Sequence, residues 1–175
     1  MRIMIFGRPG SGKTIFAFEL SQKLKLPLDH IDKYFYTSNW VERDYEEFLN
    51  IQKELVSKDH WIIDGNATRS LEMRYKRANI VIYFCYPRFK SLFNIIKRKF
   101  FYKKNININD RADGCHETIR WSLIKYIWTF ENRVKDKIKE LNLQYPEVKF
   151  YKITNDRERE EIKNKILAQA KLPFR

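Results

Sequence analysis

The first residues whose types and spacing could do chemistry form the glycine-rich segment Gly7–Thr14, with the sequence GRPGSGKT. It fits the pattern G-x-x-x-x-G-K-[S/T], follows an apolar run and precedes a helical pattern, which is the context that the pattern requires. Glycines let successive backbone N–H groups curl around a phosphate, and the helix N-terminus adds its dipole. Lys13 is expected to bridge the β- and γ-phosphates of ATP, and the Thr14 hydroxyl to ligate Mg²⁺. The predicted nucleotide-binding residues are Gly7, Gly10, Ser11, Gly12, Lys13 and Thr14.

Two carboxylates follow short apolar runs and are expected at the ligand-binding edge of a sheet. Asp64 ends the run Trp61–Asp64, and the predicted role of its carboxylate is to orient Mg²⁺ or a bound water; the alternative is an Asx turn that caps the next helix. Asp32 ends the predicted strand 27–32, where it could deprotonate an acceptor hydroxyl; the alternative is again a capping role. His30 is interpreted as structural or exposed, because no second histidine or cysteine stands at a metal-binding spacing.

Several arginines lie beside predicted helix ends or in a polar stretch. Phosphoryl transfer needs cations around the transferred group, although any single arginine can equally be a solvated surface charge. The polar stretch 103–113 is predicted to close over ATP as a lid, with an ordinary surface loop as the alternative. The arginines in question are Arg43, Arg69, Arg74, Arg98, Arg111 and Arg133.

The elements that must position these residues alternate between strand and helix patterns. Strands are predicted at 2–6, 27–32, 61–64, 80–85 and 148–153, and helices at 14–24, 44–58, 89–102, 118–130, from there to about 141, and 156–170. The helix at 118–130 is apolar almost all round, which predicts that it is buried. Alternating strands and helices indicate an α/β fold with a parallel sheet, and the length favours one domain spanning 1–175.

Composition excludes several classes of protein. The chain has 175 residues with 35 Lys+Arg and 22 Asp+Glu, a net charge of +13, and two cysteines without C-x-x-C spacing. The cysteine pattern argues against a disulfide scaffold or a zinc ribbon, and the apolar runs are too short to span a membrane. We therefore expect a cytoplasmic protein with no membrane partner. The charge indicates either a polyanionic partner, such as a nucleotide, nucleic acid or anionic lipid, or a compositional bias.

The ordered combination of motifs resembles P-loop kinases of the adenylate-kinase/shikimate-kinase type, and among them the bacterial topology-modulation proteins. The segments that carry the resemblance are GRPGSGKT, LPLDHID, NWVERDYEEF, WIIDGN, NIVIYFCYPR, DRADGCHE and KYIWTFENR. The resemblance implies a three-layer P-loop NTPase fold with a parallel five-stranded sheet in the order 2-3-1-4-5 and a lid segment.

The resemblance also implies roles for individual residues. Asp32 matches the acidic residue of the acceptor side, and Arg43, Asn66 and Arg74 match substrate-binding positions. Arg98 and Arg133 match arginines of the helices that flank the lid. Further matches are Asp64 and Gly65 in a D-G-N turn, and Gly114, Cys115 and Glu117 in a G-C-x-E element.

Three positions depart from that family's pattern and concern the lid and turnover. Ala67 stands where tyrosine is common, Cys85 stands where a strand commonly ends in aspartate, and Ile108 stands at the position of a lid arginine. Arg111 lies close enough to take the place of that arginine.

Three functions are compatible with these features. The leading hypothesis is an ATP- and Mg²⁺-dependent phosphotransferase that acts on a nucleotide or another small-molecule acceptor. The alternative is a nucleic-acid-binding, DNA topology-modulating protein with a regulatory or degenerate nucleotide site, which the charge favours but no helix-turn-helix, RRM or zinc-finger signature supports. A GTPase is the third hypothesis; it lacks an N-K-x-D element, although 154–156 follow the last strand, where a base could lie.

Overall fold

The computed structural model describes residues 1–37, 41–101 and 121–171. In this part of the chain strands and helices alternate, as the sequence predicts. The strands are β1 Arg2–Gly7, β2 Leu28–His30, β3 Trp61–Asp64, β4 Ile80–Phe84 and β5 Lys149–Ile153. The helices are α1 Lys13–Leu24, α2 Ile31–Phe35, α3 Tyr45–Ser57, η2 Thr68–Ser70, α4 Leu71–Tyr75, α5 Arg88–Phe101, α6 Trp121–Gln144 and α7 Asp156–Lys171.

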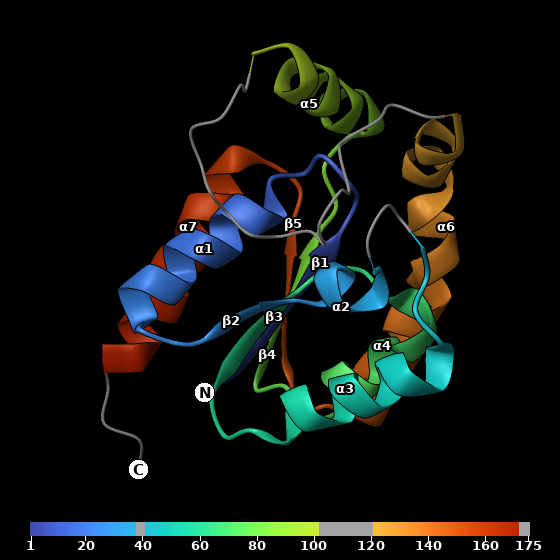
Figure 1. Ribbon diagram of the computed structural model, residues 1–175. Coiled ribbons are helices and arrows are strands. Elements are labelled where there is room, and N and C mark those ends of the chain that lie inside the picture. The colour runs from blue at the N-terminus through green and yellow to red at the C-terminus, as the bar shows by residue number, and fades with distance from the viewer. Residues whose placement is uncertain (38–40, 102–120, 172–175) are drawn as a thin grey trace.

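The strands form one parallel sheet in the order β2-β3-β1-β4-β5, which confirms the predicted order. Helices lie on both faces, with α1 and α7 on one and α3, α4 and α6 on the other (Figure 1). Because all strands run in the same direction, their carboxyl ends meet at a single edge of the sheet. The segments that follow β1, β2 and β3 therefore meet there.

Alternating side chains of β1 divide the apolar core into two layers. Ile3 and Ile5 pack with residues of α1 and α7, whereas Met4 and Phe6 pack with residues of α3, α4 and α6. All four β1 side chains are fully buried. A strand buried on both faces reads as a continuous apolar run, which is why the sequence reveals β1 so clearly.

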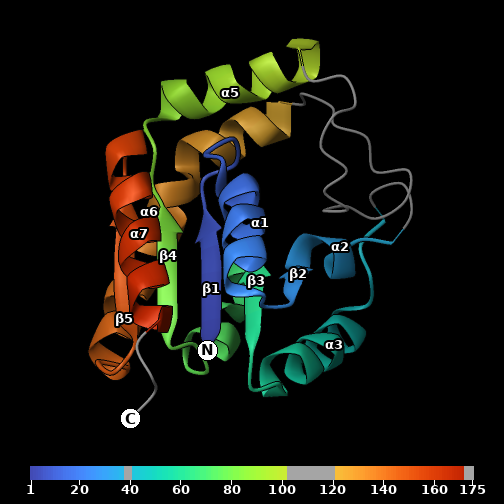
Figure 2. The ribbon, with the colours of Figure 1, turned by 90° about the vertical axis from the view of Figure 1, so that its left-hand side faces the viewer.

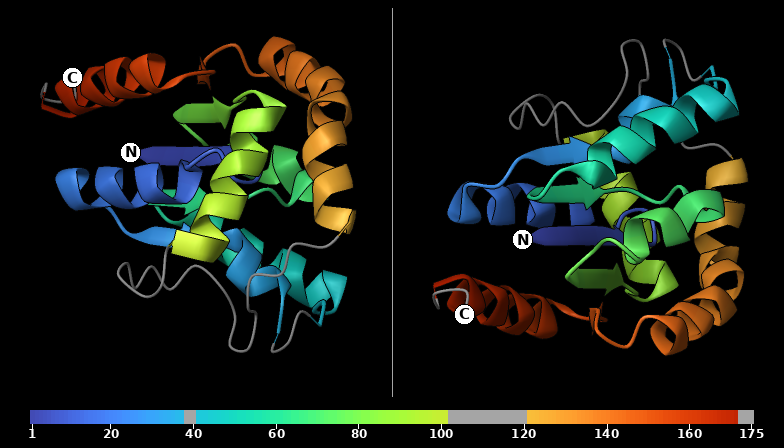
Figure 3. Two further views of the ribbon diagram at one scale, coloured as in Figure 1. Left: turned by 90° about the horizontal axis from the view of Figure 1, so that it is seen from above. Right: turned by 90° about the horizontal axis from the view of Figure 1, so that it is seen from below.

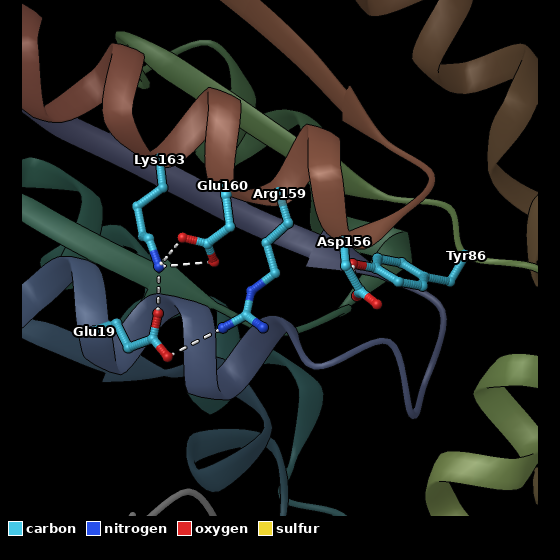
Figure 4. Close-up of polar contacts among 6 residues, drawn as sticks. All are labelled: Glu19, Tyr86, Asp156, Arg159, Glu160 and Lys163. Carbon is cyan, nitrogen blue, oxygen red and sulfur yellow. Dashed lines mark hydrogen bonds and ion pairs between the residues drawn. The ribbon is translucent and has the colours of Figure 1, made fainter.

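Helix α1 is held to α7 by an ion-pair network as well as by apolar packing. Glu19 of α1 lies 3.0 Å from Lys163 and 3.1 Å from Arg159, and Lys163 also lies 2.7 Å from Glu160 (Figure 4). Lys163 is buried, and a buried ammonium is tolerated when carboxylates surround it. The network fixes the helix whose first turn carries Lys13 and Thr14.

Helix α5 lies across the carboxyl ends of the strands rather than on a face of the sheet (Figures 2 and 3). Ser91 and Ile95 are buried on its inner side, while Phe89 and Phe93 are exposed. The inner side touches the loop after β1, so α5 closes one side of the predicted phosphate site.

Two sequence predictions about the elements are wrong. In the described region the residues after 120 form one continuous helix, α6, and not two helices. Helix α6 is also not buried all round, since Trp121 is 84% exposed and Trp128 is 40% exposed. Only one side of α6, including Ile127, Phe130 and Val134, packs on the sheet. The second strand ends at His30, so Asp32 belongs to the short helix α2.

None of the helices described in 1–37, 41–101 and 121–171 is both long and apolar enough to cross a membrane. The predicted lid at 103–113, Arg111, Ile108 and the G-C-x-E element (Gly114, Cys115 and Glu117) lie outside the described residues.

Candidate active site

The loop Gly7–Thr14 is held in shape by hydrogen bonds from three neighbouring elements. The Gly7 N–H donates to Asn66 Oδ1 at 3.0 Å, and the Arg8 N–H donates to the Phe84 carbonyl at 3.0 Å. The Asn94 side-chain amide of α5 donates to the Gly10 carbonyl at 2.9 Å. These contacts from neighbouring elements hold the loop backbone in place.

Gly10 and Gly12 of the loop, like Gly7, have backbone conformations that L side chains rarely adopt. Gly10 has a φ of +77°, and a Cβ there would clash with the Ser91 carbonyl and lie 2.8 Å from Ile95 Cγ1. Gly12 has a φ of +83°, but a Cβ there would meet no other atom within 4 Å. Gly10 is therefore required both for its conformation and for the close approach of α5, and Gly12 for its conformation alone.

Thr14 and Asp64 meet at the end of the loop. The Thr14 hydroxyl donates to Asp64 Oδ2 at 2.8 Å, and Asp64 is 3% exposed. Burial raises the pKa of Asp64, but the charge of Lys13 and hydrogen bonds from His30 and Thr14 outweigh it, so the net pKa is lowered. Asp64 is therefore an ionised carboxylate beside the first turn of α1.

A divalent cation fits this pair of residues. Asp64 Oδ1 is buried and has no hydrogen-bond partner in the described protein, so an unused carboxylate oxygen stands next to a hydroxyl. Mg²⁺ is commonly bound by one or two protein oxygens together with phosphates and water. The described residues contain no group of three or more His, Cys, Asp or Glu side chains that could hold a metal alone, which is compatible with this mode.

Asp32, in the first turn of α2, lies near Lys13 and Asp64 and close to Gly65. Burial raises its pKa, the charge of Lys13 lowers it, Asp64 raises it, and the Asn66 backbone N–H donates a hydrogen bond to the carboxylate; the net pKa is raised. The predicted place at a strand end is wrong by two residues, but the carboxyl group still faces Lys13 and Asp64. A carboxylate with a raised pKa beside a cation is suited to accept a proton.

His30 belongs to the site, although sequence reasoning set it aside. Its Nδ1 lies 3.2 Å from Asp64 Oδ2, and its side chain is 10% exposed. Strand register brings the two together: His30 is the last residue of β2, Asp64 is the last residue of β3, and the two are register partners. The search for metal-ligand spacings could not find it, because the partner is a carboxylate on a neighbouring strand.

Arg74 corrects one prediction. It is fully buried, and its guanidinium donates to the carbonyls of Gly65 at 2.8 Å, Asn66 at 2.8 Å and Ala67 at 3.1 Å. A side chain enclosed in this way does not contact a substrate. Arg74 holds the turn after β3 instead, including Ala67, whose φ of +25° lies in the left-handed region.

The Asn66 side chain lies between two parts of the molecule. Its Oδ1 accepts the Gly7 N–H of the loop, and its side chain lies near Tyr126 of α6. Asn66 is 8% exposed. The structure thus places Asn66 between the phosphate loop and α6, and its predicted contact with substrate stays a prediction.

The other predicted residues lie around this centre. Ser11 is buried in the loop, and its hydroxyl has no hydrogen-bond partner in the described protein. The Arg43 Nε–H donates to the Tyr34 carbonyl at 2.9 Å, and its side chain is 25% exposed. Arg98 is exposed on α5, and Arg133 is exposed on α6 with its guanidinium 5.5 Å from the Tyr126 ring centre.

Known structures share this arrangement of strands and helices. The chain matches no protein-family model and no curated protein sequence. A shikimate kinase from Bacteroides thetaiotaomicron superposes with a TM-score of 0.58 at 14% identity, over 98% of this chain and 99% of that chain. A gluconokinase from Sinorhizobium meliloti 1021 gives 0.59 at 12% identity, over 97% and 90%. A deoxyadenosine kinase from M. mycoides gives 0.54 at 17% identity, over 97% and 100%.

This chain therefore has the P-loop kinase fold. The identities are low enough that the likeness concerns the fold alone, and the chemistry has to be argued from the side chains at the site. The resemblance to topology-modulation proteins gains no support from these comparisons and stays a prediction.

Proposed function

We propose that this protein is an ATP- and Mg²⁺-dependent phosphotransferase that acts on a small molecule or nucleotide with a hydroxyl or phosphate acceptor group. The observation that carries the proposal is the glycine loop ending at Thr14, whose hydroxyl donates to Asp64 at 2.8 Å while the other Asp64 oxygen is buried without a partner in the described protein. Lys13 lies near both Asp64 and Asp32, and the surroundings lower the pKa of Asp64 and raise that of Asp32, which suits one carboxylate to a cation and the other to a proton. The glycine loop beside them supplies the place for phosphates.

In this proposal different residues bind the phosphates and the metal. The loop N–H groups and the Lys13 ammonium bind the phosphates of ATP, with the α1 N-terminus behind them. Asp64, ionised and held by Thr14 and His30, faces the position of the metal. When bound, Mg²⁺ neutralises phosphate charge; Thr14 and Asp64 are the residues that would hold it.

Asp32 orients the acceptor and takes its proton. Its carboxyl group lies near Lys13, between α2 and the turn after β3. Arg133, together with Arg98 and Arg111, is proposed to neutralise charge that develops on the transferred group. Arg43, on the far side of Tyr34, is proposed to bind the acceptor.

The acceptor class follows from what Asp32 can do. A carboxylate that acts as a base is useful for a hydroxyl acceptor, whose proton must leave as the new P–O bond forms, and less so for a phosphate acceptor that is already ionised. The solved structures with this fold are named for shikimate, gluconate and deoxyadenosine, which supports a hydroxyl-bearing acceptor.

The proposal is tested by a phosphorylation screen with ATP and Mg²⁺ over nucleosides, nucleoside monophosphates, sugars and hydroxy acids. At least one acceptor is expected to raise ADP production. Lys13→Ala is expected to abolish transfer and weaken ATP binding by about 2–3 kcal/mol, the loss of a charge-assisted contact. Lys23→Ala, which removes an exposed lysine from the same helix, is the matched control and should change neither.

The proposal fails if no acceptor in the screen raises ADP production, or if Lys13→Ala binds ATP as tightly as the wild type. Nucleic-acid binding that survives moderate salt, in the absence of any transfer, would favour the alternative function instead.

A further inference from the structure

The side chain of Arg8, the second residue of the phosphate loop, turns away from the phosphate site. Arg8 is 2% exposed, and its guanidinium donates to the Tyr86 carbonyl and to Glu131 Oε2, the latter at 3.2 Å. Its Nε is buried with no hydrogen-bond partner in the described protein. A buried guanidinium is costly unless it is paired, and Glu131 of α6 is the carboxylate that pairs it.

Helix α6 comes near the start of the loop at a second point. The Tyr126 side chain of α6 lies near the Asn66 side chain, and Asn66 Oδ1 accepts the Gly7 N–H at 3.0 Å. Glu131 therefore contacts Arg8 of the loop directly, and Tyr126 lies near the residue that holds Gly7. No part of this arrangement is needed to bind phosphates, because the loop N–H groups and Lys13 do that.

The same helix carries the predicted transfer arginine. Arg133 stacks on the Tyr126 ring, and its Nε–H donates to Thr129 Oγ1 at 3.0 Å. The pKa of Tyr126 is raised by burial and then by the charge of Asp32, so this ring lies near the acceptor side of the site. Where α6 sits relative to the loop thus decides where Arg133 sits relative to the reacting groups.

Apolar packing alone fixes that position poorly. Phe130 and Val134 pack on the sheet, and apolar contacts are non-directional, so they resist separation better than sliding or rotation. A charge-assisted hydrogen bond is directional and so favours one relative position of its two partners. Arg8 and Glu131 form such a bond between the phosphate loop and α6, with the guanidinium buried and the Glu131 side chain 40% exposed.

We propose that Arg8 and Glu131 are positioning residues for phosphoryl transfer: their ion pair locks α6 to the phosphate loop so that Arg133 is held beside the reacting groups. This inference rests on the proposed function, because Arg133 has a role only if transfer occurs. The residues act through α6 and touch neither ATP nor the acceptor.

Glu131→Gln tests the proposal because it removes the charge but keeps the shape. We expect kcat to fall by about 10–100-fold, the scale of a misplacement of about 1 Å at a reacting centre, while the KM for ATP stays within a few-fold. Arg8→Lys is the second variant, since it keeps the charge but loses the fork that joins Tyr86 and Glu131; it should lower kcat in the same way.

A double-mutant cycle distinguishes positioning from a general loss of structure. In an Arg133→Ala background, Glu131→Gln should lower kcat little further, because the group that it positions is already gone. Lys137→Met is the matched control: it breaks the 3.1 Å ion pair between Glu72 and a residue further along α6, and it should leave kcat unchanged.

Two outcomes would overturn the proposal. One is a kcat of Glu131→Gln and Arg8→Lys equal to the wild type at a temperature where both are folded. The other is that Glu131→Gln lowers kcat by the same factor with and without Arg133. If the wild type itself phosphorylates no acceptor, the proposed function fails; if the wild type is active and only these variants behave otherwise than expected, this inference alone fails.

Discussion

Asp32 and Asp64 carry the same functional group, yet their surroundings shift their pKa values in opposite directions. Both are enclosed by protein and both feel Lys13, but only Asp64 also accepts hydrogen bonds from Thr14 and His30. Hydrogen bonds to the ionised form favour it, whereas burial with a neighbouring carboxylate disfavours it. Because their pKa values shift in opposite directions, Asp32 and Asp64 are suited to different chemical roles and affect stability differently.

Replacing each aspartate by asparagine is expected to change stability in opposite directions. The raised pKa of Asp32 means that ionising it costs the native state stability as pH rises through that pKa, so Asp32→Asn should stabilise the protein at neutral pH. The lowered pKa of Asp64 contributes stability that is lost as pH falls through that pKa, so Asp64→Asn should destabilise it at neutral pH. Each effect should be on the order of 1 kcal/mol, or about 2–4 °C in Tm for a chain of this size.

Thermal unfolding of both variants from neutral to acidic pH tests this. The two differences from the wild type should shrink toward zero as the pH falls below the ordinary carboxyl range. Asp32→Asn should also abolish transfer while leaving ATP affinity near that of the wild type. A Tm for Asp32→Asn below that of the wild type at neutral pH would show that this carboxylate is structural.

His30 is expected to matter for the metal and not for the fold. His30→Phe leaves Asp64 Oδ2 with Thr14 as its remaining donor, so the carboxylate is less firmly oriented. Losing a group that orients a metal ligand typically costs about 10–100-fold in metal affinity. The Mg²⁺ concentration that gives half of the ATP-dependent rise in Tm should increase by that factor.

His60→Phe serves as the control for that measurement. His60 is exposed, and its Nδ1 lies 2.6 Å from the Met1 amino group. It precedes β3, whereas Asp64 is the last residue of that strand, so the two residues lie at opposite ends of β3. Its replacement should leave the Mg²⁺ dependence unchanged. Equal Mg²⁺ dependence in His30→Phe and the wild type would remove His30 from the metal site.

At the scale of elements, the phosphate loop and α5 form one packed unit. The α5 backbone lies so close to Gly10 that only a residue without a side chain fits between them, and Asn94 adds a hydrogen bond to the Gly10 carbonyl. The loop is therefore shaped by α5 from one side and by the turn after β3 from the other. A change at this contact should disturb the loop more than an equal change elsewhere in it.

Gly10→Ala and Gly12→Ala separate packing from backbone conformation. Both place a side chain at a positive φ, which costs about 1–2 kcal/mol. Gly10→Ala also forces α5 away from the loop, so we expect its free energy of unfolding to fall by about 3 kcal/mol or more, the range of severe core changes. Urea unfolding followed by circular dichroism measures the free energy of unfolding of both variants.

ATP titration of the folded variants completes that comparison. Gly10→Ala should lose most of its ATP affinity because its loop N–H groups are displaced with α5. Equal destabilisation by the two substitutions would mean that α5 moves away at little cost.

At the scale of the whole molecule, the net charge of +13 is compatible with two classes of polyanionic ligand, nucleotides and nucleic acids. On the described helix α5, Arg88, Lys90, Lys97 and Arg98 are not balanced by any acidic residue of the same helix. Such a charge raises the encounter rate with any polyanion and by itself does not choose between a nucleotide and a nucleic acid. The loop favours a nucleotide over a nucleic acid, because its N–H groups are arranged for a phosphate chain.

Nucleotide binding should therefore stabilise the whole chain in a saturable way. At an ATP concentration of about 100 times Kd the gain is about 2.7 kcal/mol, or about 5–10 °C in Tm for a chain of this size. Lys13→Ala should lose this shift. Single-stranded and duplex DNA should bind weakly, with an affinity that falls steeply between about 0.05 and 0.2 M salt.

A reversed pattern would contradict the proposed function at this scale. No ATP-dependent rise in Tm, together with DNA retained at about 0.2 M salt, would make nucleic acid the partner that explains the charge.

The sequence by itself determined the local features of this protein. The buried strands, the order of strands and helices, and the loop Gly7–Thr14 depend on short-range patterns, namely apolar runs, 3.6-residue periodicity and glycine spacing. Thr14 and Asp64, both predicted as metal ligands, each belong to a motif at the sheet edge, and the structure brings them within hydrogen-bond distance.

Tertiary structure alone decided which side chains meet. His30 joins Asp64 through strand register, Arg74 turns inward onto three carbonyls, and Glu131 reaches Arg8 across 123 residues of chain. Residue types cannot reveal such partners, because whether an arginine or histidine is exposed or paired depends on how distant elements pack. The same reason explains Trp121 and Trp128, whose apolar character predicted burial but whose helix turns them outward because only one side of α6 meets the sheet.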